Sequence, residues 1–139
     1  MSKIEIEAPK KKIKKVEIDT ALKVEARSLI QEEMQVVIKC SYKATEFLDA
    51  IRINKATFLI PHGYNFSASS LQHAENITMF PEWTFLKPGI TYHFTLIFSG
   101  LPKGCNSFDL VEKINSPGAF VVRDIKRNDT DVYYLNLEL

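Results

Sequence analysis

The chain has 139 residues, with 18 basic and 17 acidic side chains and a formal net charge of +1. This length suits one domain with one core, and the balanced charge gives no general attraction to nucleic acid or to an anionic membrane. Hydrophobic residues make up 45% of the chain, which is ordinary for a globular protein and excludes a disordered one.

The N-terminal segment "MSKIEIEAPKKKIKK" is rich in lysine. We interpret residues 1–12 as a flexible basic leader and residues 13–139 as a single β-sandwich domain. The run from Lys10 to Lys15 could neutralise phosphates, but acidic residues flank it and no aromatic or arginine residues accompany it. We therefore interpret it as a solvated leader and do not expect nucleic-acid binding.

No apolar run of signal-peptide length follows these charges, and no stretch approaches the roughly 18 apolar residues of a membrane span. If Met1 is the natural start, we expect a cytoplasmic protein. If a signal peptide has been removed from the chain, an exported location is the alternative.

Alternation of apolar and polar residues predicts strands, because successive side chains of a strand point to opposite faces. Short alternating runs occupy residues 16–18 and 22–27, and the clearest run follows at residues 34–42. Its inward face would consist of Met34, Val36, Ile38, Cys40 and Tyr42. The segment "SLIQEEM" links the run at residues 22–27 to the run at residues 34–42, and we interpret it as a turn or hairpin connection. Ser28 and Gln31 in this segment also have the spacing of a helix capping box.

The middle of the chain is less regular. A single helical turn would fit residues 46–50, and "KATFLIPHGYNF" predicts a buried strand that ends at Pro61 and continues into a His-Gly turn. Residues 67–83 have no clear period, so we expect them to form the longest irregular connection.

Strand signals return in the last third. Residues 92–98 alternate strictly, and residues 108–111 predict a return to the core. Pro88-Gly89 and Pro117-Gly118 both suit a type II turn. The C-terminal run would turn Tyr133, Leu135, Leu137 and Leu139 to one face. These spacings predict an all-β fold, an antiparallel sandwich or barrel with little helix.

Two cysteines, Cys40 and Cys105, could close a large loop as a disulfide. Two buried free thiols are the favoured interpretation, because nothing else in the sequence indicates an oxidising compartment. Cys105 in "PKGCNSF" has no local histidine partner, so we interpret it as a small hydrophobic residue and not as a nucleophile.

The sequence contains no motif for a reaction. The three histidines, His62, His73 and His93, have no metal-ligand spacing, and no nucleophile elbow or phosphate-binding glycine loop is present. Asp109 and Glu112 lie where we expect exposed side chains, so a hydrolase that uses one of them with a histidine is a less favoured alternative. We expect a protein that is not an enzyme, with no catalytic residue, no metal and no cofactor.

The remaining candidate is a group of aromatic residues. Trp83 lies near Phe80 and Phe85, and Tyr64 and Phe66 precede them. Tyr64, Phe66 and Trp83 are the candidate ligand or partner surface. They could equally form a lid that buries apolar area at an open end of the sandwich, which is the favoured interpretation.

From Ile51 to the end, the chain resembles an uncharacterised bacterial family of immunoglobulin-like domains. The resemblance depends on "IRINKATFLI", "FLKPGITYHFTLIF", "LPKGCNSFDLVE" and "GAFVVRDIKRNDTDVYYL". It implies an immunoglobulin-like antiparallel β-sandwich of about seven to nine strands, and it implies no catalytic or ligand-binding residue. In antibody domains the core tryptophan follows the first cysteine closely in the sequence, whereas Trp83 lies much farther along the chain from Cys40. This separation argues against an antibody-type disulfide core.

These features lead to a hypothesis of a non-enzymatic β-sandwich module. Its expected role is protein–protein interaction or self-assembly, with another protein or a second copy bound through edge strands. The alternative is a domain that binds a carbohydrate or a small ligand through its loop aromatics.

Overall fold

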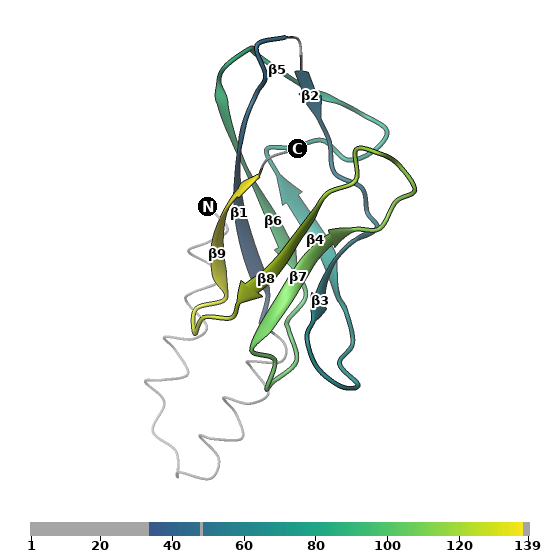
Figure 1. Ribbon diagram of the computed structural model, residues 1–139, viewed down its shortest axis with the longest axis vertical. Coiled ribbons are helices and arrows are strands. Elements are labelled where there is room, and N and C mark those ends of the chain that lie inside the picture. Colours follow the sequence, from purple (N-terminus) through teal and green to yellow (C-terminus); the bar gives the residue numbers. More distant parts are fainter. Residues whose placement is uncertain (1–33, 48, 138–139) are drawn as a thin grey trace.

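The computed structural model describes residues 34–47 and 49–137, and these residues form nine strands and no helix (Figure 1). The strands are β1 (Val36–Lys43), β2 (Asp49–Ile51), β3 (Thr57–Pro61), β4 (Ser69–Glu75), β5 (Thr84–Leu86), β6 (Thr91–Phe98), β7 (Ser107–Glu112), β8 (Val121–Lys126) and β9 (Val132–Leu137). The described part of the chain contains no helix long and apolar enough to cross a membrane. The basic leader, the expected strands at 16–18 and 22–27, the connection at 28–33 and Leu139 lie outside the described residues.

Seven strands form one curled sheet in the order β8-β7-β3-β4-β6-β1-β9, and β2 and β5 form a separate two-stranded ribbon. All neighbouring strands are antiparallel except β1 and β9, which are parallel. The predicted all-β class is confirmed, and the curled sheet gives a fold like a β-sandwich. Figure 1 shows the β2/β5 ribbon at one end of the fold and the β3–β4 connection at the opposite end.

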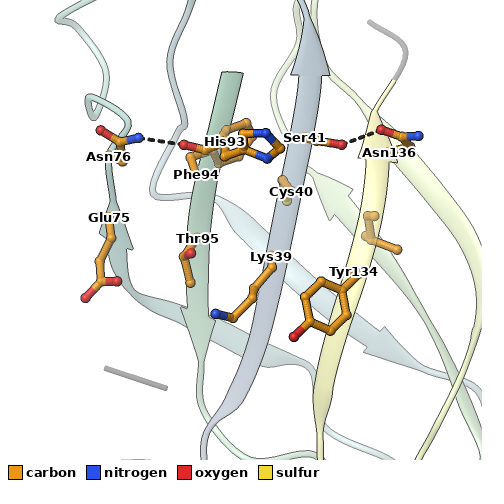
Figure 2. A pocket seen from close by; sticks show the side chains of 11 residues that line it. Lys39, Cys40, Ser41, Glu75, Asn76, His93, Phe94, Thr95, Tyr134 and Asn136 are labelled. Carbon is orange, nitrogen blue, oxygen red and sulfur yellow. Dashed lines mark hydrogen bonds between the residues drawn. The ribbon is translucent and has the colours of Figure 1, made fainter. Parts of the chain in front are cut away.

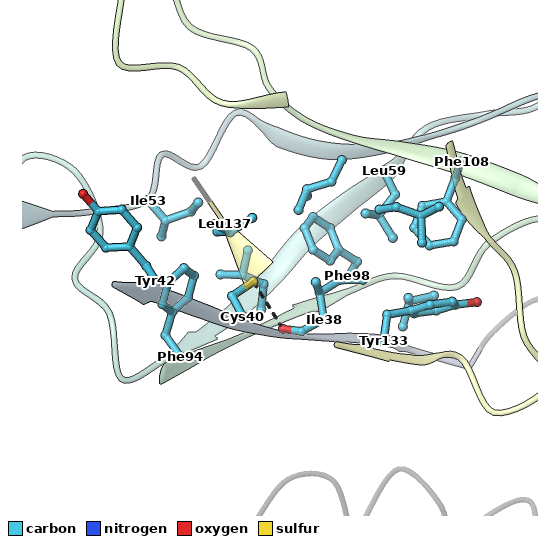
Figure 3. Close-up of a cluster of buried hydrophobic side chains, with 14 of the residues drawn as sticks. Ile38, Cys40, Tyr42, Ile53, Leu59, Phe94, Phe98, Phe108, Tyr133 and Leu137 are labelled. Carbon is cyan, nitrogen blue, oxygen red and sulfur yellow. Dashed lines mark hydrogen bonds between the residues drawn. The ribbon is translucent and has the colours of Figure 1, made fainter. Parts of the chain in front are cut away.

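The core lies inside the curl of the sheet. Strand alternation turns Ile38, Cys40 and Tyr42 inward from β1. Figure 3 shows them in one cluster, with Tyr42 at one end of it and Leu59 and Phe108 at the other. The Phe108 and Tyr133 rings meet edge to face, with centroids 5.0 Å apart, and connect β7 to β9 across the interior. Full burial of each large apolar side chain stabilises the fold by about 1.5–3 kcal/mol.

The inward faces predicted for residues 34–42, 92–98 and 133–137 correspond to this core. Met34 differs, because it packs with Val37 in a small second cluster and not in the main core. Cys40 and Cys105 are both buried free thiols, as favoured from the sequence.

The prediction of an irregular connection at residues 67–83 is wrong. Residues 69–75 form β4, which lies between β3 and β6 in the sheet. The pairing of β4 with β6 shifts register between Leu71 and His73, and such a bulge breaks the two-residue period that identifies a strand in the sequence. Ser69 is also buried at the start of β4, so a polar residue occupies an inward position.

Two local predictions fail in informative ways. The helical turn expected around residues 46–50 does not extend over Asp49 and Ala50, because Asp49–Ile51 is strand β2, paired with β5. Gly89 has a φ of 74°, as a type II turn requires, and Ile90 N donates to Lys87 O across it. Gly118 lacks the positive φ of a type II turn, so that prediction is wrong at Pro117-Gly118.

Candidate functional site at the β2/β5 end

The structure separates the three aromatic residues singled out from the sequence. Trp83 precedes β5 at the ribbon end of the fold and is 47% exposed, so it is not a buried lid. Tyr64 is 79% exposed in the β3–β4 connection at the opposite end. Phe66, in the same connection, is half-buried and packs against the core. Trp83 alone of the three belongs to the ribbon end.

Arg52 is the partner of Trp83 that sequence reasoning missed. Its guanidinium carbon lies 3.8 Å from the centroid of the Trp83 ring and 4.5 Å from that of Phe80. The Arg52 Nη1 also donates a hydrogen bond of 2.9 Å to the carbonyl of Pro81. Ile51 of β2 pairs with Thr84 of β5 in antiparallel strands. Arg52, which follows Ile51, is therefore brought opposite Trp83, which precedes Thr84. Cation–π contacts of this kind contribute about 0.5–1 kcal/mol each at exposed sites.

Other large apolar side chains are exposed at the same end. Phe85 of β5 is 69% exposed, Phe80 54%, Phe47 81% and Ile90 54%. The loops that carry Phe47 and Ile90 are joined by backbone hydrogen bonds, from Ala44 N to Ile90 O and from Gly89 N to Thr45 O. We call Phe47, Phe80, Trp83, Phe85 and Ile90, with Arg52, the ribbon-end surface.

A hollow of about 570 Å³ lies beside Arg52 and Trp83, and we call it the Trp83 pocket. Tyr42 and Asp49 line it, and the Tyr42 hydroxyl donates a hydrogen bond of 2.6 Å to Asp49 Oδ2. This bond raises the pKa of Tyr42 to about 12 and lowers the pKa of Asp49. Asp49 is therefore an anionic acceptor in the wall of the pocket at neutral pH.

Glu112 also lines the Trp83 pocket, and its expected exposure is wrong because it is only 6% exposed. Its Oε2 accepts a hydrogen bond of 3.1 Å from the backbone N–H of Asn54. Burial raises the pKa of the Glu112 carboxyl, and the hydrogen bond from Asn54 opposes that shift. The contact with Asn54 joins the end of β7 to the segment after β2, which is a structural role for Glu112.

A second hollow, of about 600 Å³, lies on the outer face of β4, β6, β1 and β9 (Figure 2). Its lining is largely polar and includes Lys39, Thr95 and Tyr134. A hydrogen bond from Ser41 to Asn136 joins β1 to β9 across it, and Asn76 Nδ2 donates to His93 O at 2.6 Å. Ser41, Asn136 and Asn76 are engaged by these two hydrogen bonds, and the lining includes none of the exposed apolar side chains of the ribbon-end surface.

The structure also brings together residues that the sequence left apart. His62 lies 2.8 Å from Asp109, which is half-buried and not exposed as expected. His73 and His93 lie on β4 and β6 and are not part of this group.

Comparison with protein-family models, with curated proteins and with solved structures finds no match.

Proposed function

We propose that the protein is a non-enzymatic binding module that docks a partner protein on the ribbon-end surface. The observation that carries this proposal is the exposure of five large apolar side chains at one end of the fold, beside an arginine held against two rings. Exposed apolar groups gathered in this way mark interaction sites in soluble proteins. Tryptophan, aromatic residues and arginine are also the residue types enriched at the centres of protein interfaces.

The placement of Arg52 supports the proposal. A free arginine side chain loses rotamer freedom when a partner immobilises it, and this loss reduces affinity. Contacts with Trp83, Phe80 and the Pro81 carbonyl already restrict Arg52 before any partner arrives. The ribbon-end surface is thus partly organised for binding.

Strand addition is a second contact available to the same partner. The β2/β5 ribbon has only two strands in the described part of the chain, so each offers one unpaired edge. The large sheet ends at β8 and β9, which are its own edge strands. The partner in this proposal is another protein or a second copy of the chain, and membership of the bacterial immunoglobulin-like family remains a prediction.

The test compares the partners retained by wild type with those retained by Trp83→Ala and Phe85→Ala, by quantitative affinity capture and by light scattering for self-association. Loss of an interface centre lowers affinity about 30-fold or more. Tyr64→Ala is the matched control, because Tyr64 is also an exposed aromatic residue but lies at the opposite end. Equal retention of every partner by wild type and both ribbon variants would contradict the proposal.

The Trp83 pocket favours a second candidate function, the binding of a carbohydrate or other small polar ligand. Its volume of about 570 Å³ lies within the range of small-molecule sites, and an aromatic ring and the Asp49 carboxylate both line it. A panel of neutral mono- and oligosaccharides should then quench Trp83 fluorescence saturably, and Asp49→Asn should weaken that response. Absence of any saturable response across the panel would remove this candidate and leave the protein-binding proposal standing.

A further inference from the structure

A second group of chemistry-bearing side chains lies on the outer face of β7, at the end of β3. His62 follows β3, and its backbone N–H donates to Ser107 O at 2.9 Å. Ser107 and Asp109 are two residues apart on β7, so both side chains point to the same face. The His62 Nδ1 lies 2.7 Å from Ser107 Oγ, and its Nε2 lies 2.8 Å from Asp109 Oδ1.

A bulge in β8 adds two more charged side chains to this face. Phe108 pairs with Ile125 and Leu110 pairs with Val122, so Arg123 and Asp124 together lie opposite Asp109. Asp124 has a φ of 57°, a left-handed conformation that aspartate tolerates better than most residues.

This backbone places the Asp124 carboxylate beside the histidine. Asp124 Oδ1 lies 3.6 Å from His62 Nδ1, and the Asp124 N–H donates to Asp109 Oδ1 at 2.9 Å. Ligand atoms of His62, Asp109 and Asp124 all lie within 4.8 Å of one another.

We propose that this cluster binds a divalent transition-metal ion of the zinc class. His62 Nδ1 and the Asp124 carboxylate are the direct ligands, and Asp109 is the residue that orients His62. Two ligands of a tetrahedral zinc ion, each about 2.0–2.1 Å from it, are about 3.4 Å apart. The 3.6 Å between His62 Nδ1 and Asp124 Oδ1 fits that spacing once the Ser107 hydroxyl, which lies 2.7 Å from the same nitrogen, turns aside.

The contact between His62 and Asp109 has the form expected beside a metal. A ligating histidine usually donates its other ring N–H to a carboxylate, which fixes the ring and its tautomer. Asp109 is 14% exposed and lies on the Nε2 side of the ring, so it can hold Nδ1 unprotonated toward Asp124. Ser107 Oγ, beside the same Nδ1, can supply a further oxygen or a hydrogen bond to a bound water.

The charges of the cluster also favour a cation. With His62 neutral, two carboxylates and the Arg123 guanidinium leave one net negative charge. Arg123 contacts Asp109 Oδ2 at 3.3 Å and is 72% exposed, so it neutralises the orienting carboxylate and leaves Asp124 to the ion. An imidazole with carboxylates selects zinc and neighbouring transition metals, whereas magnesium and calcium prefer oxygen ligands throughout.

The test titrates zinc chloride into the full chain after treatment with a chelator, by calorimetry and by NMR of the imidazole nitrogens. Wild type should bind one zinc ion and shift the Nδ1 signal of His62. His62→Ala and Asp124→Asn should each weaken binding at least tenfold, and Asp109→Asn should weaken it 10- to 100-fold, as loss of an orienting carboxylate does. Asp124→Asn decides the matter, because the side chain is 76% exposed and asparagine accepts the same φ, so the fold is retained.

His73→Ala is the matched control, since His73 Nε2 also lies near a carboxylate, 3.8 Å from Glu75 Oε2. It should bind zinc like wild type. The proposal is overturned if wild type shows no saturable binding, if Asp124→Asn binds as tightly as wild type, or if the shifted nitrogens belong to His73 or His93. This outcome is independent of the ribbon-end surface, which lies at the other end of the chain's fold.

Discussion

The ion pair between Arg127 and Asp131 is the most buried one in residues 34–47 and 49–137, with side chains 11% and 4% exposed. Arg127 donates twice, from Nε to Asp131 Oδ1 at 3.2 Å and from Nη2 to Oδ2 at 3.0 Å. Tyr133 also donates its hydroxyl to Asp131 Oδ1 at 2.8 Å. The network joins the β8–β9 turn to Pro102, whose carbonyl accepts a hydrogen bond of 2.7 Å from Arg127 Nη1.

Asp131→Asn removes the charge while keeping the shape of the side chain. Asparagine also tolerates the φ of 53° at this position, so the backbone adds little to the effect. The variant leaves the Arg127 guanidinium buried without a counter-charge, and breaking a buried pair in this way costs about 3–5 kcal/mol. We expect about 3 kcal/mol, the lower end, because the carbonyls of Pro102 and Cys105 still accept from Arg127. That is a large fraction of a typical stability of about 5–15 kcal/mol.

Urea unfolding followed by far-UV circular dichroism measures the loss. With a slope of about 2 kcal/mol per molar urea, the midpoint should fall by about 1.5 M. Asp129→Asn, a change at an exposed aspartate in the same turn, should alter stability by no more than about 1 kcal/mol, the upper limit for a charged contact at the surface. A loss below about 1 kcal/mol in Asp131→Asn would refute the view that the pair is buried and mutually dependent.

Three further outcomes are expected. Because burial raises the pKa of Glu112, its ionisation destabilises the fold as pH rises from the unfolded pKa through the folded one. The urea midpoint of Glu112→Gln should therefore rise relative to that of wild type as pH increases from 4 to 7, and a constant difference between the two proteins would contradict this. Burial raises the pKa of Cys40 to about 12 and also raises the pKa of Cys105. A thiol reagent should therefore label neither cysteine in native protein and both in denaturant, as counted by mass spectrometry, and rapid labelling of native protein would contradict this. Gly89→Ala should lower the free energy of unfolding by about 1–2 kcal/mol, measured by thermal or urea unfolding, because the φ of Gly89 is 74°. Gly118→Ala should leave that free energy unchanged or raise it slightly, and equal effects of the two substitutions would refute the distinction between the two turns.

The strands could be predicted where the evidence for them is local. Alternation over residues 34–42, 92–98 and 133–137 is visible in the sequence because each inward side chain is two residues from the next. Strand β4 escaped prediction because its bulge interrupts that period. Local patterns therefore identify strands but not the irregularities within them.

The sites could not be predicted, because each depends on pairing between distant segments. His62 and Asp109 are 47 residues apart and meet only through the register of β3 with β7. Arg52 meets Trp83 through the register of β2 with β5. The sequence singled out Trp83 for its residue type, whereas Arg52 has no motif of its own.

The parallel pairing of β1 with β9 has a consequence for how the chain folds. Ser41 and Asn136, which this pairing brings together, are 95 residues apart. Contacts of high sequence separation slow folding, because the loop between the two segments must close before they can form. Until β9 docks, one edge of β1 is unpaired, although β1 carries fully buried core residues such as Val36 and Ile38. We therefore expect slow folding with a late docking step, during which β1 is the segment most prone to pair with another chain.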